Sequence, residues 1–339
     1  MKILFRVDSY PEIAVGHLAR CIKLGKALAE LGNQITFISY DDSETKARLE
    51  EAGFKYQLIP YKINDIGFFD EELENLAKYS AEINVMIVDS YMVSDKYFDE
   101  INELFPFTVY LDDLGLDFNV DMVVNSSCKA KINDYVAPIA LCGTDYVILE
   151  YEYELGRSLS KLDKHNSVLI TMGGVDHYDL SSSLIPLIEN INNNIKLNIV
   201  IGPYYDNIDE IKLAASKSRL KINIFQGLSN ISSVILQCDI AITAGGTAVY
   251  ELAAMSTPSI GIALWNNQKA NIECLSKKGA TLPLFYSEKK EFESLLISSL
   301  KKLILDNKLR EKMSIAAREA VDGKGARRIS NKINQEYGR

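Results

Sequence analysis

His17 is the residue of this sequence best suited to move a proton. It is one of three histidines among 339 residues, and it follows a long loop after the apolar run Lys2–Val7. That run predicts a buried strand, and apolar residues at helical spacing after it predict a helix that begins near His17. Ligands of open α/β sheets collect at the carboxyl edge of the sheet, and an unperturbed imidazole titrates at about pH 6.5. The position therefore favours a catalytic acid or base over a histidine that only satisfies the end of a helix.

A glycine pair marks a second candidate site. Gly245 and Gly246 follow a predicted strand and open a predicted helix, so a phosphate could approach a backbone that carries no side chains. Thr247 could cap that helix while its hydroxyl faces the anion, and the free amides of the first turn favour negative charge there. Glu251, one turn further on, could accept hydrogen bonds from ribose hydroxyls. The alternative is an ordinary tight turn with a capping threonine and a solvated glutamate.

Two further strand ends in the second half of the chain carry similar groups. Gly173, Gly174 and Asp176 follow the first predicted strand of that half, and Asn267 and Gln268 follow a later one. Side-chain amides can donate hydrogen bonds to phosphate or sugar oxygens. The recurrence of such groups at three strand ends favours a site for a nucleotide diphosphate.

Polar side chains also end the predicted strands of the first half. Because parallel strands end at one edge of a sheet, these side chains would form a hydrogen-bonding rim suited to a sugar. The alternative is capping of the following helices, which suits Asp112 and Asp113 better than it suits a tyrosine. The residues concerned are Asp8, Asp89, Ser90, Tyr91, Asp112, Asp113, Asn125 and Ser126.

Several other chemistries lack their sequence signals. The chain has no G-x-x-x-x-G-K-[ST] phosphate loop, no G-x-G-x-x-G fingerprint and no D-x-D metal clamp. His165 and His177 have no partner at metal-ligand spacing, so we expect neither a metal nor a cofactor. We interpret His165 as a solvated linker residue and leave His177 open between surface and substrate contact.

The net charge of −9 argues against a nucleic-acid partner, because such proteins usually carry a basic excess. No apolar run approaches the ~20 residues of a membrane span. Charges appear too early in the chain for a secretion signal. We therefore expect a cytoplasmic protein without stable membrane insertion, and the oligomeric state stays open.

Short apolar runs alternate with longer helical patterns, which is typical of βαβ units and parallel sheets. In the first half, predicted strands cover 2–7, 34–39, 85–88, 107–111 and 122–125, and predicted helices cover 18–31, 43–52, 71–78 and 95–104. In the second half, predicted strands cover 167–171, 196–201, 222–225, 239–243 and 259–263, and predicted helices cover 180–191, 208–217, 231–237, 247–255, 268–278, 291–305, 309–321 and 326–336.

A chain of this length is expected to form two domains. We predict an α/β protein of the GT-B fold, with two Rossmann-like domains whose parallel sheets face each other across a cleft. Residues 1–150 would form the domain with the catalytic histidine and the sugar site, and residues 151–339 the domain that binds the nucleotide diphosphate. A return of the last helix to the first domain stays open, because the sequence does not show it. The tract 129–164 lacks clear periodicity and is interpreted as the connection.

The motifs, taken in order over about residues 1–285, resemble one family. It comprises the UDP-2,4-diacetamido-2,4,6-trideoxy-β-L-altropyranose hydrolases of pseudaminic acid synthesis. Spore-coat polysaccharide proteins share much of the set, and the second half is similar to the transferase that adds N-acetylglucosamine to cell-wall lipid intermediates. The matching residues are Arg6, Asp8, Gly16, His17, Arg20 and Cys21, then Val88, Asp89 and Tyr91, Leu111–Asp113, Gly173, Gly174 and Asp176, Ala244–Thr247 and Glu251, and Asn267 with Gln268.

The resemblance implies a nucleotide-sugar hydrolase with a UDP-sugar substrate. It implies that His17 is the base that activates water at the anomeric carbon, and it adds Arg20 to the substrate-binding residues. Glu150 stands where the family commonly has an arginine, after the run Tyr146–Leu149, so a contact to the diphosphate or the choice of sugar could differ. Two other functions stay open: a glycosyltransferase that uses the same donor, and a nucleotide-sugar binding protein without catalysis.

Overall fold

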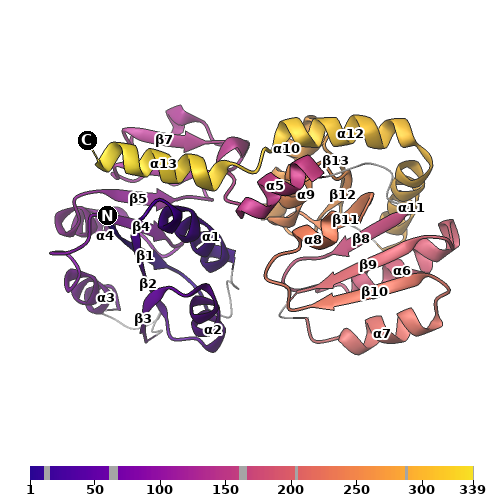
Figure 1. Ribbon diagram of the computed structural model, residues 1–339, viewed down its shortest axis with the longest axis horizontal. Helices are drawn as coiled ribbons and strands as arrows, with labels where there is room; N and C mark the ends of the chain where they lie inside the picture. Colours follow the sequence, from indigo (N-terminus) through magenta and orange to yellow (C-terminus); the bar gives the residue numbers. More distant parts are fainter. Residues whose placement is uncertain (11–15, 61–67, 160–165, 203–204, 287–288, 339) are drawn as a thin grey trace. The chain divides into compact units, whose positions relative to one another are not determined.

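The computed structural model describes residues 1–10, 16–60, 68–159, 166–202, 205–286 and 289–338. The chain divides into two compact units. Unit 1 contains residues 1–150 and the stretch from Lys324 onward, and unit 2 contains Tyr151–Gly323. Each unit is built on one sheet in which all strand pairs are parallel, with helices packed against it (Figure 1). The predicted α/β class, with two domains built on parallel sheets, is therefore confirmed.

Unit 1 has a seven-stranded sheet in the order β3-β2-β1-β4-β5-β6-β7. Its strands are β1 (Lys2–Val7), β2 (Gln34–Tyr40), β3 (Lys55–Ile59), β4 (Val85–Asp89), β5 (Thr108–Leu111), β6 (Met122–Asn125) and β7 (Ile139–Cys142). Its helices are α1 (Gly16–Glu30), α2 (Ser43–Ala52), α3 (Phe68–Ala77), α4 (Asp95–Leu104) and α13 (Gly325–Tyr337), with short 3-10 turns η1 (Ile132–Asp134) and η2 (Thr144–Tyr146).

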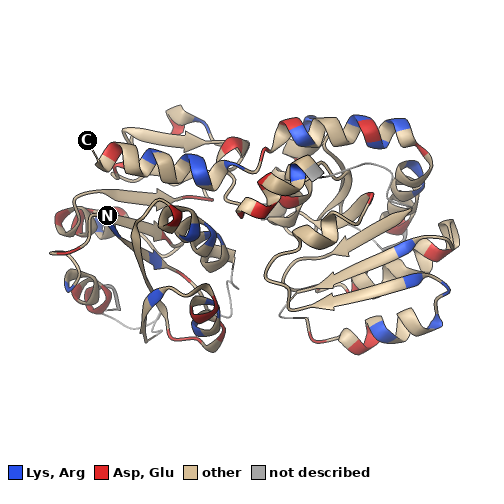
Figure 2. Ribbon diagram, viewed as in Figure 1, with Lys and Arg blue, Asp and Glu red and all other residues tan. Residues whose placement is uncertain are grey.

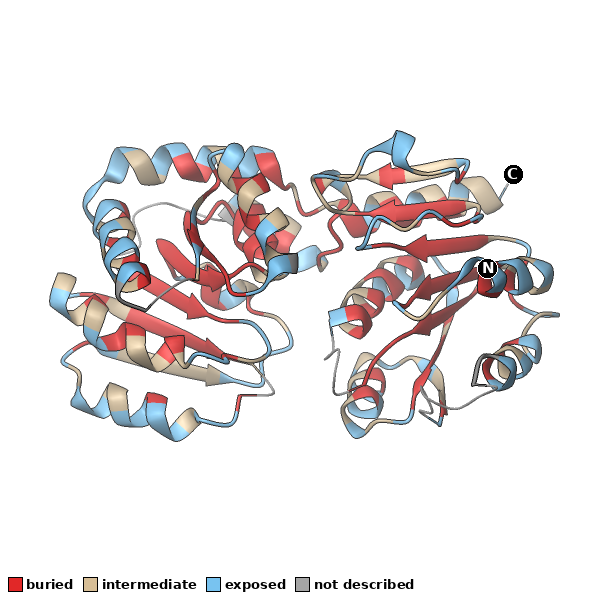
Figure 3. Cartoon of the chain, turned by 180° about the vertical axis from the view of Figure 1, so that it is seen from behind, coloured by how far each residue is buried: buried red, intermediate tan, exposed pale blue. Residues whose placement is uncertain are grey.

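The centre of this sheet is apolar on both faces, as expected for parallel strands covered by helices. All five residues of β4 are buried, and so are five of the six residues of β1 (Figure 3). Helix α1 packs on one face through Leu18, Ile22 and Leu28, whose spacing places them on one stripe of the helix. This packing fixes the start of α1 directly beside the carboxyl ends of β1 and β4.

Helix α13 belongs to unit 1, which corrects the expected domain of residues 151–339. Its side chains Ala326, Ile329 and Ile333 join the hydrophobic core between α1 and the sheet of unit 1. Polar contacts also hold it there, including Asn33 Nδ2 to Asn334 Oδ1 at 3.0 Å. The apolar stripe of α13 was visible in the sequence, but the sequence does not show which core that stripe covers.

Unit 2 has a six-stranded sheet in the order β10-β9-β8-β11-β12-β13. Its strands are β8 (Ser167–Thr171), β9 (Lys196–Ile201), β10 (Lys221–Gln226), β11 (Ile240–Ala244), β12 (Ser259–Ala263) and β13 (Thr281–Phe285). Its helices are α5 (Tyr151–Leu159), α6 (Leu180–Ile191), α7 (Ile208–Lys217), α8 (Ser232–Ile235), α9 (Ala248–Ala254), α10 (Asn266–Lys277), α11 (Lys289–Leu305) and α12 (Asn307–Ala320).

The tract 129–164 contains more structure than the expected connection, because both β7 and the helix α5 fall within it. Acidic and basic residues are mixed along outer helices such as α7 and α12, while the strands carry few charged residues (Figure 2). Within the described ranges, no helix combines the length and the apolarity that a bilayer crossing requires.

Candidate active site

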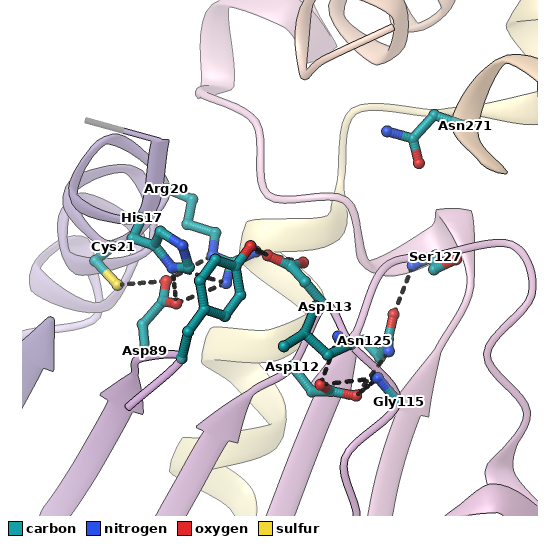
Figure 4. A network of polar contacts seen from close by, with 12 residues as sticks. His17, Arg20, Cys21, Asp89, Asp112, Asp113, Gly115, Asn125, Ser127 and Asn271 are labelled. Carbon is teal, nitrogen blue, oxygen red and sulfur yellow. Dashed lines mark hydrogen bonds and ion pairs between the residues drawn. The ribbon is translucent and has the colours of Figure 1, made fainter. Parts of the chain in front are cut away.

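Neighbouring strands of unit 1 bring the candidate residues of the first half to one edge of the sheet. β4 lies between β1 and β5, so the segments that follow these three strands are adjacent. The backbone N–H of Asp8, which follows β1, donates to the carbonyl of Asp89 at 2.9 Å. Helix α1 then carries His17 and Arg20 to the same place (Figure 4). The site is thus assembled by the parallel topology and by the packing of α1.

His17 and Asp89 form a buried pair. Nδ1 of His17 is hydrogen-bonded to Oδ1 of Asp89, and the side chains are 6% and 0% exposed. A carboxylate only accepts hydrogen bonds, so this contact keeps the imidazole proton on Nδ1. Among the described residues, Nε2 of His17 has no hydrogen-bond partner. The ring therefore presents a free lone pair, as a general base requires.

The surroundings of His17 act on its pKa in opposite directions. Burial lowers the pKa, but the charge of Asp89 and its hydrogen bond outweigh burial and raise the pKa above the ordinary histidine value. Arg20 lowers it and Asp113 raises it further. For Asp89, burial raises the pKa, but Arg20 and His17 together hold it well below the usual range. Asp89 is therefore a carboxylate at neutral pH.

Arg20 joins two carboxylates. Its Nε and Nη2 donate to Asp89 at 2.5 and 2.6 Å, and its Nη1 donates to both oxygens of Asp113 at 2.6 and 2.7 Å. The planar guanidinium fixes the two carboxylates relative to each other. The Arg20 guanidinium is bound by Asp89 on one side and by Asp113 on the other, so it holds Asp89 in place beside His17.

Tyr91 and Cys21 complete the surroundings of the pair. The ring of Tyr91 lies edge-on to the ring of His17, with centroids 4.4 Å apart, and its hydroxyl donates to Asp113 at 3.3 Å. Tyr91 is 39% exposed, so it is accessible to a ligand. Cys21 Sγ lies 3.3 Å from Asp89 Oδ2, and burial first, then Asp89, raises the pKa of this thiol, which is therefore protonated.

Asp8 lies beneath this group and is fully buried. One of its oxygens contacts Arg6, and the other accepts hydrogen bonds from Ser90 Oγ at 2.8 Å and from the Tyr91 N–H at 3.2 Å. The expected direct contact between Asp8 and a sugar does not fit this environment, because its oxygens face protein donors. The structure shows two participants that sequence reasoning missed as site residues, Arg6 and its partner Glu72.

The two adjacent aspartates after β5 have different roles. Asp112 is buried and accepts backbone N–H groups of Leu114 and Gly115, the side-chain amide of Asn125 and the hydroxyl of Tyr135. It organises its own loop and caps no helix, because β5 is followed directly by β6. Asp113 points the other way, toward Arg20 and Tyr91 (Figure 4).

Glu150 lies at the end of unit 1 and is mostly buried, with its side chain 11% exposed. Its Oε1 lies 3.4 Å from Lys26 Nζ on α1. Lys26 therefore places a cation beside this carboxylate within unit 1.

In unit 2, the ends of β8, β11 and β12 are adjacent, so the three predicted glycine and amide segments share one edge of the sheet. Gly173 has a φ of +80°, which favours glycine. Asp176 is buried and accepts the backbone N–H groups of Leu180 and Ser181 at 2.9 and 2.7 Å. Asp176 therefore stabilises the start of α6, and Gly173 and Gly174 form the exposed part of this turn.

The two glycines before α9 lie in different surroundings, one crowded and one open. A Cβ on Gly245 would lie 2.9 Å from side-chain atoms of Gln268 and Ile272, so this glycine allows α10 to pack closely. A Cβ on Gly246 would meet nothing within 4 Å. Thr247 is exposed and its side chain makes no capping hydrogen bond, contrary to the expected cap. The open backbone at Gly246 and the Thr247 hydroxyl are the groups here that a phosphate could reach.

The remaining candidates of unit 2 have mixed environments. Glu251 is 8% exposed on α9. Gln268 uses its side-chain oxygen to accept the Leu264 N–H at 3.0 Å, which leaves its amide hydrogens as possible donors. Asn267 lies on α10, but its side chain is outside the described residues, and so is His165. His177 is exposed and packs edge-on to Trp265 with ring centroids 5.4 Å apart.

In the part of the chain that the structure describes, no three His, Cys, Asp or Glu side chains come close enough together to hold a metal ion. The chemistry that the described side chains of unit 1 can supply is acid–base chemistry at His17.

The arrangement of strands and site segments can be compared with known proteins. Residues 168–332 match the glycosyltransferase family 28 C-terminal domain. Over its full length the chain is similar to MurG of Acinetobacter baumannii, with a TM-score of 0.73 at 14% identity and coverage of 98% and 99% of the two chains. The spinosyn forosaminyltransferase SpnP aligns over both complete chains with a TM-score of 0.66 at 12% identity. The protein is glycosyltransferase-like and has the GT-B fold.

Sequence relatives confirm the resemblance stated from the motifs. The chain is 24% identical to the UDP-2,4-diacetamido-2,4,6-trideoxy-beta-L-altropyranose hydrolase of Campylobacter jejuni, over 82% of this chain and 97% of that protein. It is 23% identical to the spore coat polysaccharide biosynthesis protein SpsG of Bacillus subtilis, over 99% of both. It is 25% identical to an uncharacterised protein of Methanocaldococcus jannaschii over 77% of this chain, which spans 55% of that longer relative.

Proposed function

We propose that this protein is a nucleotide-sugar hydrolase that releases UDP from UDP-2,4-diacetamido-2,4,6-trideoxy-β-L-altropyranose or a close relative. The observation that carries the proposal is the His17–Asp89 pair, whose Nε2 is unpartnered among the described residues. Asp89 orients the ring and stabilises the imidazolium that forms when the base accepts a proton. Such a base typically contributes about 10²–10⁴-fold to a rate.

In the proposed step, the oxygen of a water molecule attacks the anomeric carbon of the sugar. The bond between that carbon and the oxygen of the β-phosphate breaks, and its electron pair leaves with UDP. The proton lost by the water passes to Nε2 of His17. The products are UDP and the free sugar with inverted configuration at the anomeric carbon.

Unit 2 supplies the groups that we propose bind the nucleotide. The open backbone at Gly246, the free hydroxyl of Thr247 and the exposed turn at Gly173 and Gly174 can donate hydrogen bonds to phosphate oxygens. Donors aimed at a departing diphosphate stabilise the charge that develops on it. Glu251, Asn267 and Gln268 are proposed to contact the ribose or the sugar.

The substrate is proposed from the named hydrolase relative, whose alignment covers most of both chains. Tyr91 and Arg20 border His17 and are proposed to contact the sugar, with Tyr91 the more accessible. Glu150 departs from the family's arginine, so a related sugar is included in the proposal.

A second candidate is a glycosyltransferase that uses the same donor. The match of residues 168–332 to a glycosyltransferase family domain favours it. In that case an acceptor hydroxyl would take the place of water, and His17 would deprotonate it in the same way.

Product analysis with a panel of UDP-linked diacetamido sugars distinguishes the two. We expect UDP and free sugar in equal amounts when no acceptor is present. Turnover only after an acceptor is added would establish transfer and reject hydrolysis. In water enriched in ¹⁸O, the label should enter the sugar. Label in UDP would mean attack at phosphorus and would refute the proposed step.

Two variants separate chemistry from binding. His17→Ala should lose most turnover, about 10²-fold or more, and keep nearly normal affinity for UDP. Glu251→Ala should chiefly weaken UDP binding, measured by calorimetry. A His17→Ala protein with nearly full activity would contradict the assignment of the base.

A further inference from the structure

A buried ion network lies directly beneath the candidate site of unit 1. Arg6 on β1 donates from Nε and Nη2 to the two carboxylate oxygens of Glu72 on α3, at 2.8 and 2.7 Å, and its Nη1 contacts Asp8. The three side chains are 2%, 1% and 0% exposed. They are therefore enclosed by protein and have no surface from which to touch a substrate.

Two tyrosines complete this inner network. The hydroxyl of Tyr97 on α4 donates to Glu72 at 2.7 Å, and the hydroxyl of Tyr40 on β2 accepts a hydrogen bond from Arg6. Buried ion groups lose their hydration, and apolar side chains of similar volume often stabilise a core as well or better. Stability alone is thus a weak reason for this network, whereas its hydrogen bonds fix the positions of its members.

The inner network has a direct connection to the candidate site. Asp8 accepts hydrogen bonds from Ser90 Oγ at 2.8 Å and from the Tyr91 N–H at 3.2 Å, and its own N–H donates to the Asp89 carbonyl at 2.9 Å. Asp8 therefore holds the turn 89–91 from below. The same turn presents Asp89 and Tyr91 to His17 on its other side.

The site is thus held by two carboxylate–arginine–carboxylate groups that meet at the turn 89–91. The outer one is Asp89–Arg20–Asp113, which fixes the carboxylate that binds His17. The inner one is Glu72–Arg6–Asp8, which fixes the backbone that carries this carboxylate. A displacement of about 1 Å in a catalytic group can cost 10²-fold in rate, so both the outer and the inner group affect how well His17 can act as a base.

We propose that Glu72, Arg6 and Asp8 are positioning residues that hold the turn 89–91, and through it the ring of His17, in the geometry a general base requires. This inference rests on the proposed function for its consequence in catalysis. It assigns Asp8 to the support of the site, where the sequence suggested contact with the sugar.

The test compares Glu72→Gln and Ser90→Ala with a matched control. Glu72→Gln keeps the length of the side chain and removes its charge. Ser90→Ala removes the hydroxyl that donates to Asp8 and accepts the Met92 N–H. The control is Ser39→Ala, which removes an equally buried hydroxyl that donates to the backbone carbonyl of Val7 and bonds to none of the side chains of the network.

The first readout is the imidazole of His17, observed by NMR during a pH titration. The charged or titratable groups that face it are Asp89 at the end of β4, Arg20 on α1, Tyr91 after β4 and Asp113 after β5. Cys21 on α1 lies against Asp89. If the turn loosens, His17 loses part of its contact with Asp89. We expect its pKa to fall by about 0.5 unit or more in both network variants and to stay unchanged in Ser39→Ala.

The second readout is the kinetics of UDP release. We expect kcat to fall by about 10- to 100-fold in both network variants, with KM within about 2-fold of the wild type. Ser39→Ala should match the wild type in both constants. The thermal midpoints of Ser90→Ala and Ser39→Ala should be similar, because each loses buried hydroxyl hydrogen bonds.

The two readouts separate the inference from the proposed function. A wild-type protein that releases no UDP would reject the proposed function, and the NMR titration would still judge the positioning role. Folded network variants whose His17 titrates as in the wild type would overturn the inference. If Glu72→Gln does not fold, Ser90→Ala alone decides, because it keeps Glu72, Arg6 and Asp8 and removes the side-chain hydrogen bond that joins Asp8 to the turn, together with the bond from the Met92 N–H.

Discussion

Replacing Asp89 by asparagine tests the central pair most directly. The substitution keeps the shape of the side chain and removes the charge that raises the pKa of His17. Burial and Arg20 then act on the imidazole with less opposition, and both lower its pKa. In the wild type, the rate should rise with pH through an inflection above the ordinary histidine value of about 6.5, because only neutral His17 can accept a proton. In Asp89→Asn this inflection should move to lower pH.

The rate at the plateau should also fall. An asparagine can present its amide hydrogens to Nδ1, which favours the tautomer with the proton on Nε2 and removes the free lone pair. We expect a loss of about 10²–10⁴-fold in kcat, the range typical of a general base. Stability should fall as well, by about 3–5 kcal/mol, because Arg20 and His17 would lose a buried carboxylate that accepts from both.

The assay is UDP release across about pH 5–9, with circular dichroism at each pH as the control for folding. A folded Asp89→Asn protein whose pH–rate inflection coincides with that of the wild type would refute the reasoning, since the pair would then not set the protonation of the base. An unchanged plateau would refute the tautomer argument separately.

Three further predictions concern other parts of the chain. Ile329→Ala, at a fully buried position of α13, should cost about 2–5 kcal/mol in urea denaturation, whereas Ile315→Ala, 55% exposed, should stay within about 0.5 kcal/mol; equal effects would argue against α13 as part of the core. Gly245→Ala should destabilise the protein by about 1–3 kcal/mol, because the new Cβ meets α10. Gly246→Ala should fold normally and weaken UDP binding, because its Cβ would occupy the open space at this backbone. Normal UDP affinity of Gly246→Ala would exclude a phosphate beside Gly246. The pKa of His17 is raised in the folded state, so protonated His17 stabilises the fold fully below about pH 6.5, and this stabilisation is lost as the pH rises through the folded-state pKa. The difference in unfolding free energy between wild type and His17→Ala should therefore shrink as the pH rises. A difference that stays constant would show that the pKa of His17 is the same in the folded and unfolded states.

The parallel sheets were predictable because their central strands are continuous apolar runs. The strands that sequence reasoning missed, β3, β7 and β13, each lie at an edge of a sheet. β3 is partly exposed and its sequence mixes polar and apolar residues, whereas β7 is apolar but only four residues long. β13 also contains Pro283, which an edge tolerates and a central strand does not. Edge position thus weakens the signal without removing it, because the fourth edge strand, β10, was predicted at 222–225.

The candidate site divides in a similar way. His17, Asp89 and Tyr91 were found because polar groups at strand ends stand out from apolar strands. Glu72 was not found, since it lies in an acidic helical run that looks like any solvated helix face. Nothing local distinguishes it from its neighbour Glu71. Its partner is 66 positions away in sequence, and only the fold brings the two together.

Arg6 offered a signal that could have been used. An arginine within an otherwise apolar, central strand is buried with the strand, and a buried guanidinium must be paired. Residues two apart on a strand point to the same face, so Arg6 and Asp8 had to share a face beneath the sheet edge. From that alone, Asp8 is expected to pair with Arg6 before it contacts any ligand, as the structure shows. A second acidic partner could be anticipated but not located, because the orientation of α3 over the sheet is set by packing between distant segments.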